Sequence, residues 1–220
     1  MKRVLEPEVM DTPEEADAYD AMDHSGPNGS FVDRLGELGA RGRALDIGCG
    51  PGQVALLVLD RLEAVTEVVG VDLAQNMLDH AERHRAASPH RDRVRFELGD
   101  AKGLAFESGS FDTVFSNTIL HHIPDPLPFL REVWRTLAPG GTLLVRDLFR
   151  PADEATVAQL VREHAADAAP EQRELFRASL CAAFTPDELR DLAASAGLEG
   201  VTVTVDSDRH VSLQRASTPG

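Results

Sequence analysis

Short apolar runs alternate with amphipathic helical patterns through residues 43–149 of this chain. Strands that are apolar on both faces are typical of parallel sheets covered by helices on both sides. The alternation therefore predicts an α/β fold with a Rossmann-like, doubly wound sheet. We expect Pro139-Gly140-Gly141 to break the chain before the last strand of this region. The predicted strands are residues 43–47, 67–72, 93–98, 111–116 and 142–149, and the predicted helices are residues 51–63, 75–87 and 126–137.

The segments on either side of this region have helical patterns of their own. Thr185 and Pro186 are a typical N-cap and first residue of a helix, which should end at Gly197. Residues 201–205 and 210–214 then predict a short antiparallel hairpin. Four further helices are expected at residues 12–22 and 29–38, separated by Pro27-Asn28-Gly29, and at residues 154–169 and 171–183, separated by Pro170.

Composition limits the partners of the chain. Its 220 residues suit one domain, and 22 Lys and Arg against 37 Asp and Glu give a formal net charge of -15. That charge argues against nucleic acid and against anionic membranes, because both attract basic surfaces. No signal peptide is recognisable and no apolar stretch approaches the roughly 18 residues of a membrane span. With only two cysteines, Cys49 and Cys181, the sequence lacks a disulfide framework and predicts a cytoplasmic protein. We expect it to be a monomer or a homodimer.

A glycine-rich loop follows the first predicted strand. Asp46-Ile-Gly-Cys-Gly-Pro-Gly52 leads directly into a helix, which is the arrangement of a nucleotide-type binding turn. Read alone, the loop is ambiguous, because Gly50-Pro-Gly-Gln-Val-Ala55 also fits the dinucleotide pattern G-x-G-x-x-A. Asp72 lies 22 residues after Gly50, close to the roughly 20 expected for a ribose-binding acid. An NAD-dependent oxidoreductase is therefore one reading of this loop.

Acidic residues recur after successive strands. Asp46, Asp72 and Asp100 are separated by 26 and 28 residues, about one βαβ unit each. Because the carboxyl ends of parallel strands meet at one edge of the sheet, the three carboxylates should converge where open α/β folds bind ligands. A pyrophosphate would be repelled by Asp46 at the mouth of the loop, whereas an ammonium or a sulfonium would be attracted.

Five segments of the chain carry further motifs, in order ALDIGCGPG, GVDLAQNML, GDAKGLAF, SFDTVFSNTILHHI and LREVWRTLAPGGTLLVRDLF. Together they resemble the motifs of class I S-adenosylmethionine-dependent methyltransferases, in particular the small-molecule branch typified by ubiquinone and menaquinone methyltransferases. The resemblance covers about residues 40–150, and it implies a seven-stranded sheet of order 3-2-1-4-5-7-6 with an antiparallel C-terminal strand.

The resemblance also implies how the cofactor S-adenosylmethionine would be held. Gly48, Gly50 and Gly52 would form the loop under its methionine moiety. Asp46 would hold the amino-acid end, and Asp72 would accept hydrogen bonds from both ribose hydroxyls.

The remaining implied contacts surround the adenine and the reacting end of the cofactor. Leu73 and Met77 would pack against the adenine or the ribose. Asp100 would accept from the adenine amino group, and Ala101 would offer its backbone N–H. Asn117 would lie beside the methionine end through its backbone.

Outside these motifs, Tyr19 and three histidines are candidates for function. Tyr19 could donate to the cofactor carboxylate, and His24 could face the methyl acceptor. His121 and His122 follow the fourth strand, and one of them could be a general base. Adjacent residues point in different directions, so no metal site is expected there.

Four other residues have two readings each. His80 and His84 stand four residues apart on a helix, which is half a zinc site or, more simply, a solvated face. Arg146 and Asp147 end the fifth predicted strand, where they would touch the acceptor or form a surface ion pair.

The function implied is transfer of a methyl group to a small-molecule acceptor by in-line displacement, with S-adenosylhomocysteine as product. Apart from the NAD-dependent oxidoreductase, a non-catalytic cofactor-binding subunit remains an alternative, because fold does not fix function. We expect one domain with four segments: an N-terminal helical lid (1–40), a cofactor-binding core (41–150), a helical acceptor cap (151–183), and a last helix with the terminal hairpin (184–220).

Overall fold

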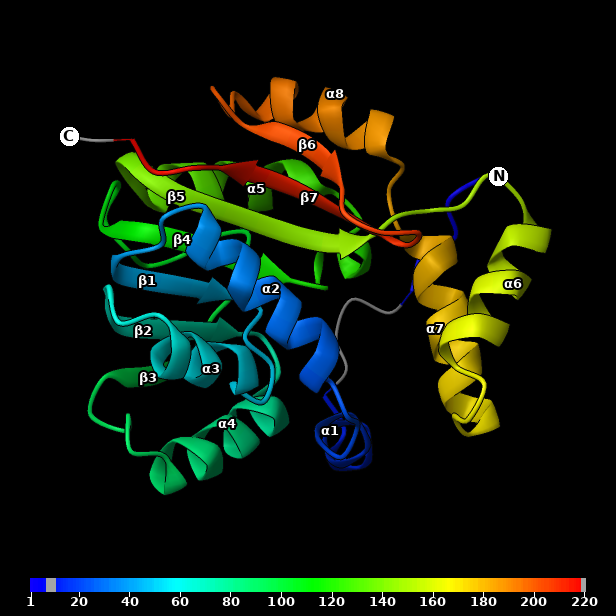
Figure 1. Ribbon diagram of the computed structural model, residues 1–220, viewed down its shortest axis with the longest axis horizontal. Helices are drawn as coiled ribbons and strands as arrows, with labels where there is room; N and C mark the ends of the chain where they lie inside the picture. The colour runs from blue at the N-terminus through cyan, green and yellow to red at the C-terminus, as the bar shows by residue number, and fades with distance from the viewer. Residues whose placement is uncertain (7–10, 219–220) are drawn as a thin grey trace.

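Among the residues that the computed structural model describes, 1–6 and 11–218, seven strands form one sheet in the order β3-β2-β1-β4-β5-β7-β6 (Figure 1). Neighbouring strands are parallel from β3 to β5, whereas β7 is antiparallel to both β5 and β6. The predicted α/β class, strand order and antiparallel end are confirmed. The strands are β1 (Gly42–Ile47), β2 (Val65–Asp72), β3 (Val94–Leu98), β4 (Phe111–Asn117), β5 (Leu137–Leu148), β6 (Thr202–Val205) and β7 (His210–Arg215).

Successive residues of each central strand pack against different helices, because strand side chains alternate between faces. Leu45 and Ile47 belong to the core that α5 and α8 complete, whereas Ala44 belongs to the core under α2 and α3. Both faces of the sheet are therefore covered, which explains the continuous apolar runs in the sequence. The helices are α1 (Pro13–Asp20), α2 (Ser25–Glu37), α3 (Gln53–Arg61), α4 (Gln75–Ala87), α5 (Pro126–Thr136), α6 (Glu154–His164), α7 (Pro170–Ala182) and α8 (Pro186–Ala196), with a 3-10 turn η1 (Leu120–His122).

Two predicted breaks are wrong. Pro27-Asn28-Gly29 lies inside α2, because Pro27 occupies the first helical turn, where its missing N–H costs no hydrogen bond. Pro139-Gly140-Gly141 lies inside β5, which begins at Leu137 directly after α5. There the register against β4 shifts between Phe111 and Thr113, so the three residues form an irregularity within the strand.

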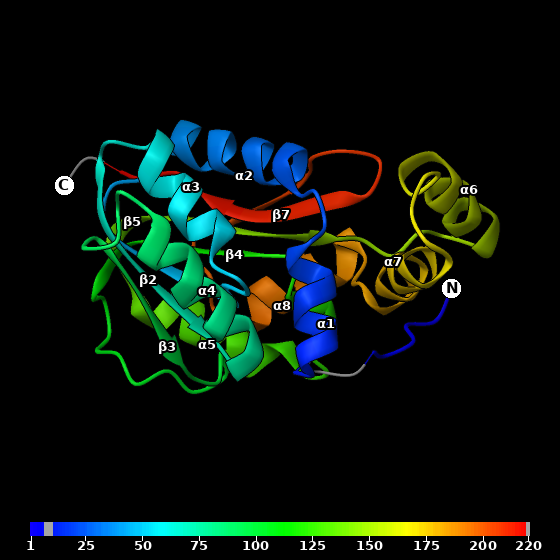
Figure 2. The ribbon, with the colours of Figure 1, turned by 90° about the horizontal axis from the view of Figure 1, so that it is seen from below.

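Helices α6 and α7 pack against each other beyond the end of β5, away from the sheet (Figures 1 and 2). The first residues of the chain run along this pair, and the Val4 N–H donates to the Cys181 carbonyl (3.1 Å). On the other side, α1 packs against α4 through a small apolar cluster that includes Ala16 and Met77. The N-terminal segment and the α6–α7 pair thus stand at the carboxyl end of the parallel strands. No helix in the described part of the chain is both long and apolar enough to cross a bilayer.

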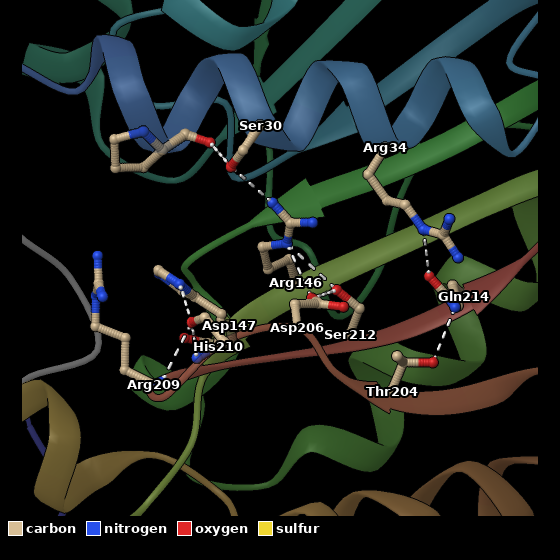
Figure 3. Close-up of polar contacts among 12 residues, drawn as sticks. Ser30, Arg34, Arg146, Asp147, Thr204, Asp206, Arg209, His210, Ser212 and Gln214 are labelled. Atoms are coloured by element: carbon tan, nitrogen blue, oxygen red, sulfur yellow. Dashed lines mark hydrogen bonds and ion pairs between the residues drawn. The ribbon is translucent and has the colours of Figure 1, made fainter.

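Polar side chains fasten α2 to the last strands of the sheet (Figure 3). The Arg34 guanidinium donates to Gln214 Oε1 (3.0 Å), and the Gln214 amide donates to Thr204 Oγ1 (2.9 Å). Arg146 reaches Asp206 at 3.1 Å and Ser30 Oγ at 3.3 Å. Arg146 is therefore a buried cation paired with the β6–β7 turn, so the surface ion pair, one of the two readings of Arg146 and Asp147, is wrong.

Candidate functional site

A pocket lies at the carboxyl ends of β1, β2, β3 and β4, where the acidic residues were expected to converge. It encloses about 160 Å³, far more than the roughly 15 Å³ that one water needs, so it accommodates an organic ligand. Of the residues assigned to the cofactor from the sequence, all but Gly52 line it. They are Tyr19, Asp46, Gly48, Gly50, Asp72, Leu73, Met77, Asp100, Ala101 and Asn117.

The glycine loop is held by the neighbouring strand. The N–H groups of Gly48 and Cys49 both donate to the Val71 carbonyl, at 2.7 and 3.1 Å. Gly48 has φ +73, and a Cβ there would lie 2.5 Å from Ile119 Cγ2. Gly52 stands behind the pocket as the left-handed N-cap of α3, where a Cβ would collide with the Phe96 ring. The loop therefore needs glycine at both positions, for packing as well as for conformation.

Asp72 joins the loop to the helix that follows β2. Its Oδ2 accepts from the Gly50 N–H (2.8 Å) and its Oδ1 accepts from the Ala74 N–H (2.9 Å). Burial raises the pKa of Asp72, while these backbone donors act against that rise. Each carboxylate oxygen keeps a second lone pair, so a diol on the ligand could still be bound by both oxygens.

Asp46 and His24 bring unsatisfied polar atoms to the pocket. Asp46 Oδ2 and His24 Nε2 are buried without a hydrogen-bond partner. Burial first, and then the charge of Asp72, raises the pKa of Asp46 well above its ordinary value. A buried carboxylate oxygen with no donor is costly, so the site fits a ligand that supplies an ammonium or another donor at this point.

Asp100 lies on a more exposed wall of the pocket. Its Oδ1 accepts from the Lys102 backbone N–H and is paired with the Lys102 ammonium, both at 2.9 Å. Burial would raise the pKa of Asp100, but Lys102 lowers it below the ordinary value. Lys102 lines the same wall of the pocket, although the sequence analysis did not assign this residue to the site.

Tyr19 and His24 come from the N-terminal segment and close one side of the pocket. Their ring centroids are 4.7 Å apart. Burial and the nearby Asp72 raise the pKa of Tyr19 to about 12, so its hydroxyl stays a donor at neutral pH. Residues 7–10 of the predicted lid lie outside the described residues.

The two adjacent histidines have different surroundings. His122 lines the pocket, whereas His121 lies behind its wall and is 2 % exposed. His121 Nδ1 is 2.7 Å from Asp147 Oδ1, and Asp147 Oδ2 accepts from the His121 N–H at 2.8 Å. Burial alone would lower the pKa of His121, but Asp147 and Glu6 raise it. Of the two histidines named as candidate bases, His122 lines the pocket and His121 does not, and Asp147 does not line it either.

The pair His80 and His84 is not the solvated helix face that was predicted. His80 is 7 % exposed because α1 covers it. Its Nδ1 lies 3.0 Å from Asp20 and its Nε2 lies 2.9 Å from Asp17, while His84 Nε2 lies 3.3 Å from Asp20. These contacts fasten α1 to α4 beside the pocket. The sequence could not show this, because the acids that meet the histidines lie about sixty residues away.

One residue with a strained backbone also lines the pocket. Thr118 has φ +66, the only non-glycine positive φ among the described residues, and its N–H donates to the Arg146 carbonyl (2.8 Å). Such a conformation is unusual for a β-branched residue and is often found at binding sites. No signal in the sequence marks it, apart from its place after Asn117.

Replacement of His80 by alanine should loosen α1 without unfolding the sheet. Besides His80, α1 is held by a small apolar cluster and by Asp20, which meets His84 and accepts from the Gln53 amide, so the helix should loosen locally. If the lid contributes to binding, we expect affinity for S-adenosylhomocysteine, measured by calorimetry, to fall about tenfold, because part of the population is then open. His90→Ala, on the loop after α4, is the control. Equal affinity in both variants would contradict a role for the lid.

The comparisons with known proteins agree with this geometry. A family model described as a methyltransferase domain matches residues 45–145. Demethylmenaquinone methyltransferase of Symbiobacterium thermophilum is 33% identical over 107 residues, 49% of this chain and 43% of the relative. 27-O-demethylrifamycin SV methyltransferase of Amycolatopsis mediterranei is 35% identical over 139 residues, 60% of this chain and 50% of the relative. The chain thus spans about half the length of these curated relatives.

A solved structure gives the same match. Phosphoethanolamine N-methyltransferase 2 of Haemonchus contortus, in complex with S-adenosyl-L-methionine, superposes with a TM-score of 0.65 at 25% identity. The superposition covers 88% of this chain and 43% of that chain.

Proposed function

Because the chain belongs to the class I S-adenosylmethionine-dependent methyltransferases, we propose that it transfers a methyl group from this cofactor to a small-molecule acceptor. The observation that carries the proposal is the unpartnered Asp46 Oδ2 in a pocket shared with Asp72 and Asp100. A ligand with an ammonium, a ribose diol and an adenine amino group offers donors to all three carboxylates. The family membership sets aside the NAD-dependent alternative.

In this proposal the chain's residues bind and orient, and the cofactor supplies the activated methyl group. Asp46 receives the ammonium, Asp72 the ribose, and Asp100 with Ala101 the adenine edge. Holding two reactants in line can lower the barrier by roughly 7–11 kcal/mol, so little covalent chemistry is required of the protein.

Other residues complete the pocket on the acceptor side. Leu73 and Met77 pack beside the cofactor, and Asn117 lies near its methionine end. We assign His24 and His122 to the acceptor side because both line the pocket and neither belongs to the glycine loop.

We keep the division into a lid (1–40), a core (41–150), a cap (151–183) and a terminal segment (184–220) as part of the proposal. Its support is that α1 contacts the pocket wall and that α6 and α7 stand apart from the sheet. The acceptor would bind between lid and cap. A cytoplasmic location is proposed from the two buried free cysteines, and the oligomeric state remains a prediction.

Cofactor binding should release a proton from Asp46. The raised pKa means that the apoprotein holds this proton to a higher pH than an exposed carboxyl would, and an ammonium placed beside Asp46 lowers the pKa again. Affinity for S-adenosylhomocysteine should therefore rise with pH through the range in which apo Asp46 ionises. Calorimetry in two buffers of different ionisation enthalpy measures the released protons.

Asp46→Asn is the matched control for this measurement. The variant should bind more weakly and without the proton release. Proton release that is the same in wild type and Asp46→Asn would show that another group is titrated.

The proposed reaction is tested by incubating the full chain with labelled S-adenosylmethionine and a panel of hydroxyl, amine and carbon acceptors. Transfer of label to an acceptor supports an enzyme. Tight cofactor binding without transfer to any acceptor would favour the non-catalytic alternative.

A further inference from the structure

Metal-ligand side chains gather at two places in residues 1–6 and 11–218. One group is Glu163, His164 and Asp208, which are all exposed. The other is Glu6, His121 and His122, which lies at the junction of the N-terminal segment, η1 and α7. In the second group the side chains of His121, Glu6 and His122 are 2%, 9% and 22% exposed. Of these two groups, only the second is largely sheltered from water.

The ligand atoms of this second group are already close together. Glu6 Oε2 lies 3.7 Å from His121 Nε2 and 3.3 Å from His122 Nδ1. Two ligands bound to one tetrahedral zinc at about 2.0–2.1 Å lie roughly 3.3–3.4 Å apart. The histidine rings stand 4.1 Å apart at 36°, so adjacent residues do turn toward one carboxylate here. All three ligand atoms lie within 4.8 Å of one another, so side-chain movements without any change of the backbone would bring them to one ion.

The orientation of His121 is fixed by a second carboxylate. Asp147 holds His121 Nδ1 at 2.7 Å, and accepts from its backbone N–H as well. This leaves Nε2 directed to Glu6. A histidine whose other nitrogen donates to a buried carboxylate is the arrangement that commonly supports a metal ligand.

The charged groups around His121 also favour the binding of a cation. The charged groups acting on His121 are Asp147, Glu6 and Arg3. Arg3 is turned to the carbonyls of His121 and Ile123, at 2.9 and 3.0 Å, and does not bridge the two carboxylates. Two carboxylates against one guanidinium leave one negative charge among these groups. Either a metal ion or a proton shared by the imidazoles can compensate it.

We propose that Glu6, His121 and His122 bind one divalent transition-metal ion, with Zn²⁺ as the ion that this ligand set fits best. Two imidazoles and one carboxylate suit zinc, whereas Mg²⁺ and Ca²⁺ prefer oxygen ligands. Three protein ligands leave a fourth position open, as in zinc sites that bind water or substrate. Because His122 also lines the pocket, the ion would stand in the pocket wall, and an oxygen of the acceptor could take that position. Only this last step rests on the proposed function.

The test uses the full chain stripped of metal with a chelator, then titrated with Zn²⁺ by calorimetry and with Co²⁺ by visible absorption. Cofactor and acceptor are left out, so the result is independent of methyl transfer. We expect one ion per chain and an absorption of four-coordinate Co²⁺. Glu6→Gln removes a charged ligand at nearly constant size and should weaken Zn²⁺ binding at least a hundredfold. Asp147→Asn should weaken it about 10–100-fold by freeing His121.

His164→Ala, in the exposed group, is the matched control and should leave Zn²⁺ binding unchanged. If Asp147→Asn fails to fold, Glu6→Gln still decides the question, because its thermal unfolding without metal reports whether the fold is intact. The proposal is overturned if the wild type binds no Zn²⁺ at micromolar concentration, or if Glu6→Gln binds it as well as the wild type. Loss of binding in His164→Ala alone would place the ion at the exposed group instead.

Discussion

Asp72→Asn should abolish most cofactor binding while leaving the fold intact. Hydrogen bonds to a charged group contribute about 1.5–3 kcal/mol each, so losing the charged acceptor for two ribose hydroxyls should weaken S-adenosylhomocysteine binding about a hundredfold or more. The asparagine NH₂ would also face the N–H of Gly50 or Ala74, from which the Asp72 carboxylate now accepts a hydrogen bond.

Asp72→Asn should change the stability of the protein much less than its affinity for the cofactor. The pKa of Asp72 is raised in the folded chain, so its ionised form opposes folding above the ordinary pKa of aspartate. Removing that charge should keep the free energy of unfolding at neutral pH within about 1 kcal/mol of the wild type. Asp92→Asn, at an exposed site, is the control for both measurements. Unchanged affinity in Asp72→Asn would remove Asp72 from the site.

Gly48→Ala should lower the free energy of unfolding more than Gly50→Ala, the other substitution in the glycine loop. The left-handed backbone costs an L-residue about 1–2 kcal/mol, and the clash of Cβ with Ile119 adds about 1–3 kcal/mol. Denaturant unfolding should therefore show a loss of about 2–5 kcal/mol. Binding of S-adenosylhomocysteine should also weaken, since Ile119 lines the pocket.

Alanine substitutions at two other glycines distinguish the cost of the left-handed backbone from the cost of the Cβ clash. Gly50 has a positive φ but open space around a Cβ, so Gly50→Ala should show the backbone cost alone. Gly103 has neither feature, and Gly103→Ala should be close to wild type. Ile119→Ala in the Gly48→Ala background should restore part of the loss. Equal stability of the Gly48→Ala and Gly103→Ala variants would contradict the packing described here.

The periodic parts of the fold were predictable because they depend on local pattern. Apolar runs located β1 to β4, and the acids after them located the edge at which Asp46, Asp72 and Asp100 meet. Turn residues were less informative. Pro27 was expected to lie between two helices, but its place in the first turn of α2 made it compatible with a helix.

The unpredicted parts depend on contacts between distant segments. His80 is buried only because α1 brings Asp17 and Asp20 across from sixty residues away. His121 turns from the pocket because Asp147 of β5 holds its ring. Periodicity within a single segment carries no information about such partners, so the roles of the histidines had to come from the structure.

The central claim is that the pocket at the strand ends binds S-adenosylmethionine through Asp46 and Asp72. Calorimetry of the full chain with S-adenosylmethionine, S-adenosylhomocysteine and NAD tests it most directly. The account predicts that the first two ligands bind one per chain and compete, that Asp72→Asn weakens both, and that NAD does not bind. Binding of NAD without binding of S-adenosylhomocysteine would contradict it.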